Sequence, residues 1–239
     1  MINWKSPANM IGTYILPFHN SMVVSPPGRV KPGQGTLILV PSIMRSGTHL
    51  LIDTILNNFS AYRRRPLYVD LDRLLDEPDG RDERVEQLLG AGAYVVKTHY
   101  PQVYCHPDRE PFVLRVARQS NIITVNRKFE QTFRSSSSWG HPIAEDKDIY
   151  RESILRFRRF WSEEPMLEVS FPELTIPLHQ KATIENISGY INVGLSDSKP
   201  VVVTIPKNKR LKVYIAKLLT RLFGNYSPVI NTTIRYASD

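Results

Sequence analysis

Four short apolar segments, separated by longer stretches with helical spacing, constrain the fold of this chain more than any other feature. They are rich in β-branched residues and apolar at almost every position, which is the pattern of strands buried on both faces. Strands that alternate with helices predict a parallel sheet with helices on both faces, an α/β fold. The segments are TLILVP (36–41), AYVVKTH (93–99), NIITVNR (121–127) and MLEVSF (166–171).

The intervening stretches have the spacing and end signals of helices. Apolar residues recur every three or four positions, a Gly follows one stretch, and a Pro stands at the start of another. The stretches that carry these signals are 48–59, RDERVEQLLG (81–90), PFVLRVARQ (111–119), the segment around Ser135, and DIYRESILRFRRFWSEE (148–164).

A chain of 239 residues is of ordinary length for one α/β domain, and we expect a single domain over residues 1–239. The Pro/Gly-rich loop SPPGRVKPGQG (25–35) separates an N-terminal segment, 1–35, from the first strand. We expect the ligand-binding core over 36–175, and a C-terminal part over 176–239.

The chain is basic. Lys and Arg number 31 against 23 Asp and Glu, giving a net charge of +8, which favours anionic ligands such as nucleotides, nucleic acids, anionic lipids or acidic glycans. The single cysteine, Cys105, cannot form an intramolecular disulfide, and the apolar piece 11–18 is too short for a signal peptide or a membrane span. We therefore predict a cytoplasmic protein.

The first strand runs directly into Arg45, Ser46, Gly47 and Thr48 and then into a helix. Backbone N–H groups, two hydroxyls and the positive end of a helix dipole then point to one place, which predicts a phosphate cradle in a P-loop-like sheet. The alternative interpretation is an ordinary N-capped turn. The ATP-binding pattern G-x-x-x-x-G-K-[ST] does not fit, because Pro41 replaces its first Gly and no Lys follows Gly47.

Lys97, Thr98 and His99 end a second buried strand, at the edge where open α/β sheets bind their ligands. A neutral His there can accept a proton from a hydroxyl, and Lys97 can stabilise negative charge on a transferred or leaving group. The alternative for His99 is a hydrogen-bonded structural histidine.

Arg127 ends a third strand, and Ser135 follows eight residues later in the next helix. These two side chains could hold one phosphate from two sides. Alternatively, the serine run belongs to a polar helix end.

In this order, the three motifs resemble those of the sulfotransferases that use 3'-phosphoadenosine 5'-phosphosulfate (PAPS). The cofactor loop of that family, Pro-Lys-Ser-Gly-Thr-Thr, is similar to MRSGTH (44–49), with Arg45 in place of Lys. The family's Lys-Thr-His motif with a following Pro matches 97–101, and its Arg and Ser eight residues apart match Arg127 and Ser135. A weaker match is MLEVSFPEL (166–174).

The resemblance implies a sulfotransferase in which His99 is the general base and Lys97 and Arg45 are further catalytic residues. It implies that Arg45, Ser46, Gly47 and Thr48 bind the 5'-phosphosulfate, that Arg127 and Ser135 bind the 3'-phosphate, and that Phe171 packs or stacks near the adenine. No metal is expected, since six scattered histidines and one cysteine have no zinc-type spacing.

The chain departs from the family pattern in three places. The family's C-terminal Arg-Lys-Gly clamp has no clear counterpart, and IPKNKRLK (205–212) is the nearest basic cluster. Leu50 stands where the family has an aromatic residue after the loop. No Asn-Pro follows Arg127, so the role given to Ser135 is open to Ser136, Ser137 or Arg134.

The acceptor stays open among small molecules, glycans and lipid-like compounds, and the sequence gives no signal for oligomeric state. Nucleic acid is disfavoured because aromatic and basic residues do not interleave regularly. The basic amphipathic stretch 207–223 could lie on an anionic membrane or form the core face of a last helix. The alternative functions are a divergent nucleotide-binding, kinase-like P-loop protein and a non-catalytic anion binder.

Overall fold

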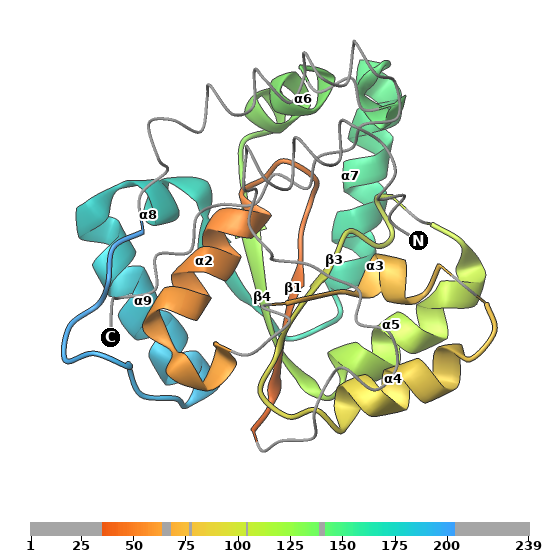
Figure 1. Cartoon of the computed structure of the whole chain (residues 1–239). Coiled ribbons are helices and arrows are strands. Elements are labelled where there is room, and N and C mark those ends of the chain that lie inside the picture. The colour runs from red at the N-terminus through yellow and green to blue at the C-terminus, as the bar shows by residue number, and fades with distance from the viewer. Residues whose placement is uncertain (1–34, 64–67, 77, 104, 139–141, 204–239) are drawn as a thin grey trace, which may run out of the picture.

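The computed structural model of the protein describes residues 35–63, 68–76, 78–103, 105–138 and 142–203 (Figure 1). In this part of the chain five strands form one parallel sheet, in the spatial order β2-β3-β1-β4-β5. The strands are β1 (Leu37–Pro41), β2 (Val69–Asp70), β3 (Val95–Thr98), β4 (Ser120–Asn126) and β5 (Leu167–Ser170).

β1 lies in the middle of the sheet, with β3 and β2 on one side and β4 and β5 on the other. An open parallel sheet binds its ligands at the carboxyl ends of the strands, where the strand order reverses. The carboxyl end of β1 is that point, and the turn predicted to bind phosphate follows it. Register brings Lys97 beside both Val40 of β1 and Asp70 of β2.

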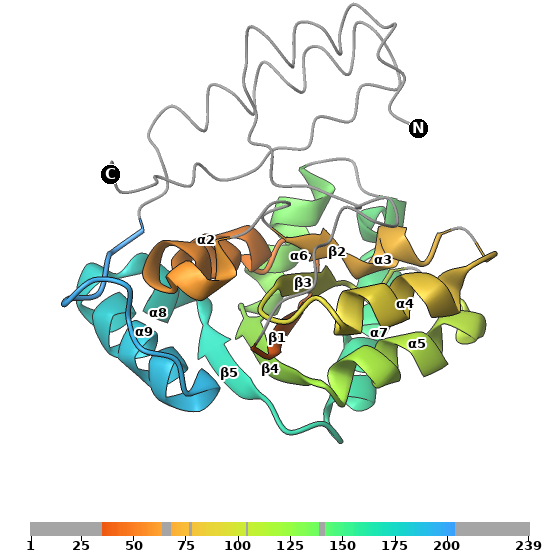
Figure 2. The same cartoon turned by 60° about the horizontal axis from the view of Figure 1, so that its bottom comes forward.

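Helices cover both faces of the sheet (Figures 1 and 2). Alternate residues of β1 explain this, because Leu37 and Leu39 join one apolar cluster and Ile38 and Val40 join the other. The second cluster contains α2 (Thr48–Asn58), α8 (Phe171–Thr175) and α9 (Pro177–Ile191). The first contains α3 (Leu71–Leu74), α4 (Arg81–Leu89), α5 (Glu110–Ala117) and α7 (Lys147–Trp161), while α6 (Phe129–Ser137) lies above the carboxyl edge. Short 3-10 helices span Ser60–Tyr62, Pro107–Arg109 and Pro142–Ala144.

The predicted fold class is confirmed: the protein has an α/β fold with a P-loop-like parallel sheet and helices on both faces. The four predicted strands and the predicted helices are present within a few residues of their expected ends. α7 illustrates why, since the Asp146 side chain caps its start and Tyr150, Ile154 and Trp161 are buried along one stripe. β2, α3, α8 and α9 were not predicted.

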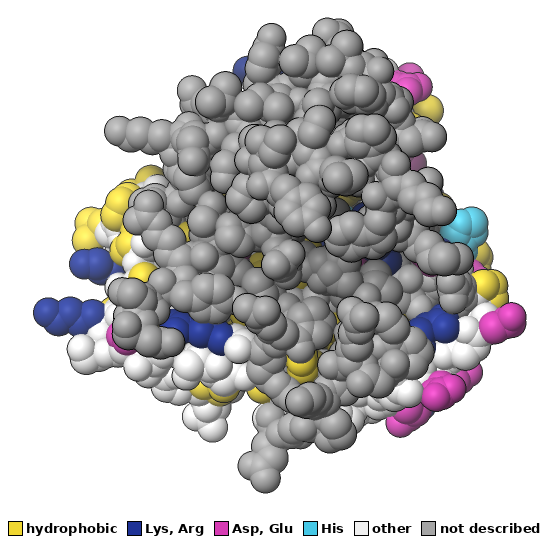
Figure 3. Space-filling model, in the orientation of Figure 1, with side chains coloured by type: hydrophobic (Ala, Val, Ile, Leu, Met, Phe, Trp, Pro, Cys, Tyr) yellow, Lys and Arg dark blue, Asp and Glu magenta, His cyan; other side chains and the backbone are white. Residues whose placement is uncertain are grey.

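The surplus of basic residues is not uniform over the described surface. In Figure 3 acidic side chains gather at the lower right, over α4 and α5. The first turn of α4 carries two acidic residues, Asp82 and Glu83.

Within the described residues, no helix combines the length and the hydropathy that a membrane span requires. The segment 1–34, the basic cluster 205–212 and the amphipathic stretch 207–223 lie outside the described residues.

Candidate functional site

The turn between β1 and α2 is held in an uncommon backbone conformation. Arg45 has φ 68° and Gly47 has φ 125°, and both values lie in the left-handed half of conformational space that side chains disfavour. Gly47 is the N-cap of α2, and no side chain caps this helix. The ordinary Ser/Thr cap, which was the alternative interpretation, is therefore not formed, and the N-terminal end of the helix dipole faces the turn.

The hydroxyls of this turn differ in their contacts. Thr48 Oγ1 is 2.6 Å from Ser42 Oγ, so these two hydroxyls bind each other. Ser46 is fully buried, and its Oγ has no hydrogen-bond partner in the described part of the chain. A buried hydroxyl without a partner costs about 1–3 kcal/mol, so Ser46 is the hydroxyl of the turn that a bound ligand would satisfy.

Two motifs that are far apart in sequence meet beside the turn. Arg45 Nε donates to Ser135 Oγ at 3.2 Å, and one terminal nitrogen of Arg127 donates to the Arg45 carbonyl at 3.1 Å. Arg127 Nε also donates to Gln131 Oε1 on α6 at 3.2 Å. The first and third predicted motifs thus form one cluster of two guanidinium groups and a hydroxyl.

The two guanidinium groups of this cluster are held at an electrostatic cost. The pKa of Arg45 is lowered to about 10, chiefly by burial and secondly by the positive charge of Arg127, while the Tyr150 phenol acts in the opposite direction. Burial also lowers the pKa of Arg127, again opposed by Tyr150. An anion bound between the two groups would relieve both effects.

Phe171, the first residue of α8, completes this side of the site. Its ring centroid is 4.1 Å from the Arg127 guanidinium carbon. A Cβ added to Gly47 would lie 2.7 Å from Phe171 Cδ2, so the ring packs directly against the turn. A side chain at position 47 would therefore clash with the ring.

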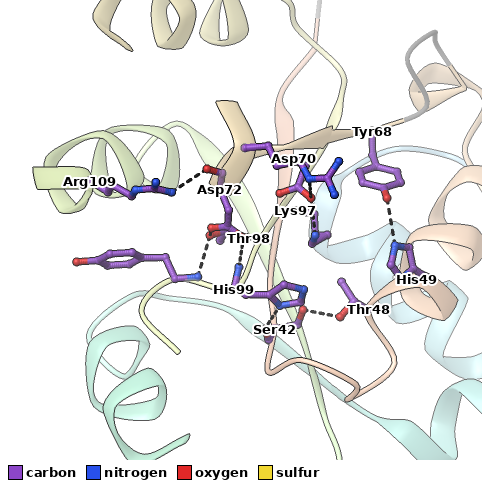
Figure 4. Close-up of polar contacts among 12 residues, drawn as sticks. Ser42, Thr48, His49, Tyr68, Asp70, Asp72, Lys97, Thr98, His99 and Arg109 are labelled. Atoms are coloured by element: carbon purple, nitrogen blue, oxygen red, sulfur yellow. Dashed lines mark hydrogen bonds and ion pairs between the residues drawn. The ribbon is translucent and has the colours of Figure 1, made fainter. Parts of the chain in front are cut away.

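Lys97 and His99 lie on the other side of the turn, at the end of β3 (Figure 4). Lys97 Nζ forms an ion pair with Asp70 Oδ2 at 2.6 Å, and His99 Nδ1 is 2.6 Å from the Ser42 carbonyl oxygen. A carbonyl only accepts hydrogen bonds, so Nδ1 carries the proton and, in the neutral ring, Nε2 carries the lone pair. That is the tautomer a general base needs at Nε2.

Asp72 holds the end of β3 in place (Figure 4). Its carboxylate accepts from Thr98 Oγ1 at 2.6 Å and from the His99 N–H at 2.7 Å, while Arg109 donates to its backbone carbonyl at 2.8 Å. Burial raises the pKa of Asp72 to about 7, with a further contribution from Asp70, whereas Lys97 and the two hydrogen bonds act to lower it.

The sequence interpretation missed Asp70, the last residue of β2, and Asp72, which follows it in α3. β2 has only two residues, which is too short for a clear periodic signal. The alternation of apolar and acidic residues in YVDLD (68–72) was the available signal. Ser42 was also missed, because nothing in its sequence position indicates a contact with His99.

These features define a P-loop-like α/β protein with an uncapped helix N-terminus and a two-arginine cluster at the switch point of its sheet. No family model matches the chain, and a comparison with curated proteins finds no match. Among solved structures, shikimate kinase from Bacteroides thetaiotaomicron is similar, with a TM-score of 0.43 and 13% identity over 66% of this chain and 99% of that chain. So slight a likeness carries no argument about chemistry.

Proposed function

We propose that this protein is a sulfotransferase that moves a sulfuryl group from PAPS to a hydroxyl or amine acceptor. The observation that carries the proposal is the convergence of Arg45, Arg127 and Ser135 beside the turn that opens α2. The motifs were matched to the family one by one from sequence, and their contact in space is an independent observation in favour of one shared ligand.

The charge distribution of PAPS explains why two anion-binding groups are needed. Its 5'-phosphosulfate and 3'-phosphate are on opposite sides of the ribose. The turn of residues 45–48, with the dipole of α2, would bind the first group, and Arg127 with Ser135 would bind the second. A nucleotide without a 3'-phosphate would offer no anionic group to Arg127.

The transfer step proposed is an in-line displacement at sulfur. The acceptor oxygen or nitrogen forms a bond to sulfur, and the bond between sulfur and the bridging phosphate oxygen breaks, releasing adenosine 3',5'-bisphosphate. His99 Nε2 takes the acceptor proton, because the Ser42 carbonyl holds the other ring nitrogen protonated. Lys97 and Arg45 would stabilise the negative charge that develops on the transferred and leaving groups.

A nucleotide kinase is the second candidate, and the carboxylates at the end of β2 favour it. A kinase needs acidic groups to hold Mg²⁺ beside the phosphates. Asp70, however, is bonded to Lys97, and both oxygens of the Asp72 carboxylate accept hydrogen bonds from the end of β3.

Thermal unfolding with different nucleotides separates these candidates. Adenosine 3',5'-bisphosphate should raise Tm more than ADP or ATP with Mg²⁺, because only the bisphosphate has a 3'-phosphate for Arg127 to bind. A ligand at a hundred times its Kd adds about 2.7 kcal/mol to stability. Arg127→Ala should abolish that selectivity. Arg156→Ala is the matched control, since this exposed arginine lies on α7 and has no part in the proposed site.

Two results would redirect the work. An equal or larger shift with ATP and Mg²⁺ would favour the kinase. A shift that is selective for the bisphosphate but accompanied by no transfer to small alcohols, glycans or lipid-like acceptors would leave a non-catalytic anion binder. In the sulfotransferase, His99→Ala should abolish transfer of labelled sulfate and change bisphosphate affinity by less than about threefold, because the proposed role of His99 is to take the acceptor proton and not to bind the nucleotide.

A further inference from the structure

Phe171 contacts the arginine cluster rather than standing apart from it. The ring lies 4.1 Å from the Arg127 guanidinium carbon, and its Cδ2 and Cε2 atoms pack against Gly47. A guanidinium within about 6 Å of a ring centroid is attracted by the negative face of the ring. One face of Phe171 is therefore already used by Arg127.

The orientation of Arg127 depends on neutral groups. Its hydrogen bonds go to the Arg45 carbonyl and to the Gln131 amide oxygen, and the Phe171 ring supplies the third contact. None of these contacts neutralises the guanidinium, so its charge stays available to an anion. Ordering an arginine side chain costs up to about 2 kcal/mol in conformational entropy. Because the Phe171 ring already orders the Arg127 side chain in the free protein, less of this cost remains to be met when an anion binds.

The position of Phe171 is itself well fixed. It follows Ser170, the N-cap of α8, whose backbone N–H donates to the Glu173 carboxylate at 2.5 Å in a capping box. The ring is thus placed by the end of β5, a strand of the sheet that forms the site, and by the capped start of α8.

We propose that Phe171 is a positioning residue for Arg127, holding its guanidinium for a 3'-phosphate, and not the surface on which an adenine stacks. The inference rests on the proposed function and assigns Phe171 a different role from the one that the sequence resemblance implies. Its consequence is that Phe171 contributes to the recognition of the phosphate and not of the base.

Isothermal titration of two nucleotides tests this assignment. Adenosine 3',5'-bisphosphate and AMP differ only by the 3'-phosphate, so the ratio of their Kd values reports recognition of that group. Phe171→Leu should weaken bisphosphate binding about fivefold, the equivalent of one cation–π contact, and change AMP binding by less than about twofold. Phe171→Tyr keeps the aromatic face and should restore the wild-type ratio.

Background variants complete the test. In Arg127→Ala, adding Phe171→Leu should not change the ratio further, because Phe171 acts through Arg127. Phe112 is a partly buried aromatic residue on α5, so Phe112→Leu is the control for loss of ring volume and should leave the ratio unchanged. Phe171→Met also removes the aromatic face, so it should weaken bisphosphate binding by the same factor as Phe171→Leu. It replaces the leucine variant if that variant does not fold.

The outcomes are distinct. An equal loss of affinity for both nucleotides would mean that Phe171 stacks on the base, and would overturn the inference while leaving the proposed function in place. No loss for either nucleotide would also overturn it. A wild-type protein that does not prefer the bisphosphate to AMP would overturn the proposed function and this inference with it.

Discussion

The two sides of the turn that opens α2 are built on opposite principles. On the β4 and α6 side, Arg45 and Arg127 repel each other, and their hydrogen bonds to Ser135, Gln131 and the Arg45 carbonyl are bonds to neutral groups. On the β2 and β3 side, the charges are paired: Lys97 with Asp70, and the Asp72 carboxylate with two N–H or O–H donors.

The difference separates ligand binding from support. Side-chain hydrogen bonds and ion pairs hold a structure in one arrangement, whereas neighbouring charges of the same sign favour binding of an opposite charge. We therefore expect the β2 and β3 side to govern stability and the β4 and α6 side to govern affinity for anions. Four predictions test this division.

The largest effect should follow Asp72→Ala. The substitution leaves the Thr98 hydroxyl and the His99 N–H without their acceptor in a site where Asp72 is 2% exposed. Removing one member of a buried ionic network costs about 3–5 kcal/mol, and we expect about 3 kcal/mol of unfolding free energy to be lost in urea titrations followed by circular dichroism. Asp82→Ala is the control, because its side chain is 80% exposed and its ion pair with Arg115 lies at the surface, so it should cost about 1 kcal/mol or less.

If Asp72→Ala cost no more than the Asp82 control, the β2 and β3 side would not be the supporting side, and the comparison would fail at its first step.

Gly47→Ala should have the next largest effect. The added Cβ would approach Phe171 Cδ2 to 2.7 Å at a φ of 125°, so strain and overlap act together. Strained backbone of this kind costs about 1–3 kcal/mol, and we expect a loss of about 2–3 kcal/mol in the same unfolding assay, together with loss of bisphosphate binding. Gly189→Ala on α9 is the matched control, since nothing lies within 4 Å of its added Cβ, and it should stabilise the protein by up to about 1 kcal/mol.

A Gly47→Ala protein with wild-type stability would show that the turn is more adaptable than its contact with Phe171 indicates.

The pH dependence of stability should carry the signature of Asp72. Its pKa is raised from 3.8 in the unfolded chain to about 7 in the folded one, so the folded state holds the proton more tightly. The contribution to stability is therefore fully present below about pH 4 and is lost as pH rises to about 7, with a slope of at most about 1.4 kcal/mol per pH unit.

Urea titrations at several pH values across this window, on wild type and on Asp72→Asn, measure the slope. The variant should lose the Asp72 component. Identical slopes in the two proteins, or a wild-type stability that rises with pH relative to the variant, would mean that the two hydrogen bonds to the carboxylate outweigh its burial.

The smallest effect on stability should come from Arg127→Ala. Removing the guanidinium also removes its repulsion of Arg45, so the unfolding free energy should stay within about 0.5 kcal/mol of wild type. Bisphosphate affinity should nevertheless fall about tenfold or more, as expected for a charge-assisted contact. A loss of several kcal/mol in stability, or an unchanged Kd measured by titration calorimetry, would place this arginine among the structural residues.

The sequence supported more inferences on the β4 and α6 side than on the β2 and β3 side. Arg45, Gly47, Arg127 and Ser135 were recognisable because motif spacing and strand ends place them at one edge. Asp70 and Asp72 were not recognisable, because a two-residue strand gives almost no periodic pattern. Ser42 was not recognisable either, because its carbonyl at the end of β1 contacts His99 at the end of β3, 57 positions away in the sequence.

Strand and helix positions, and with them the parallel α/β class, were determined by the sequence itself, because burial on two faces imposes local periodicity. Tertiary structure alone decided three contacts of the site. They are the approach of Arg45 to Ser135, 90 positions apart, the stacking of Arg127 on Phe171, and the pairing of Lys97 with Asp70. Local propensity is recorded in neighbouring residues, whereas contacts between side chains depend on strand order and register, which distant parts of the chain set together.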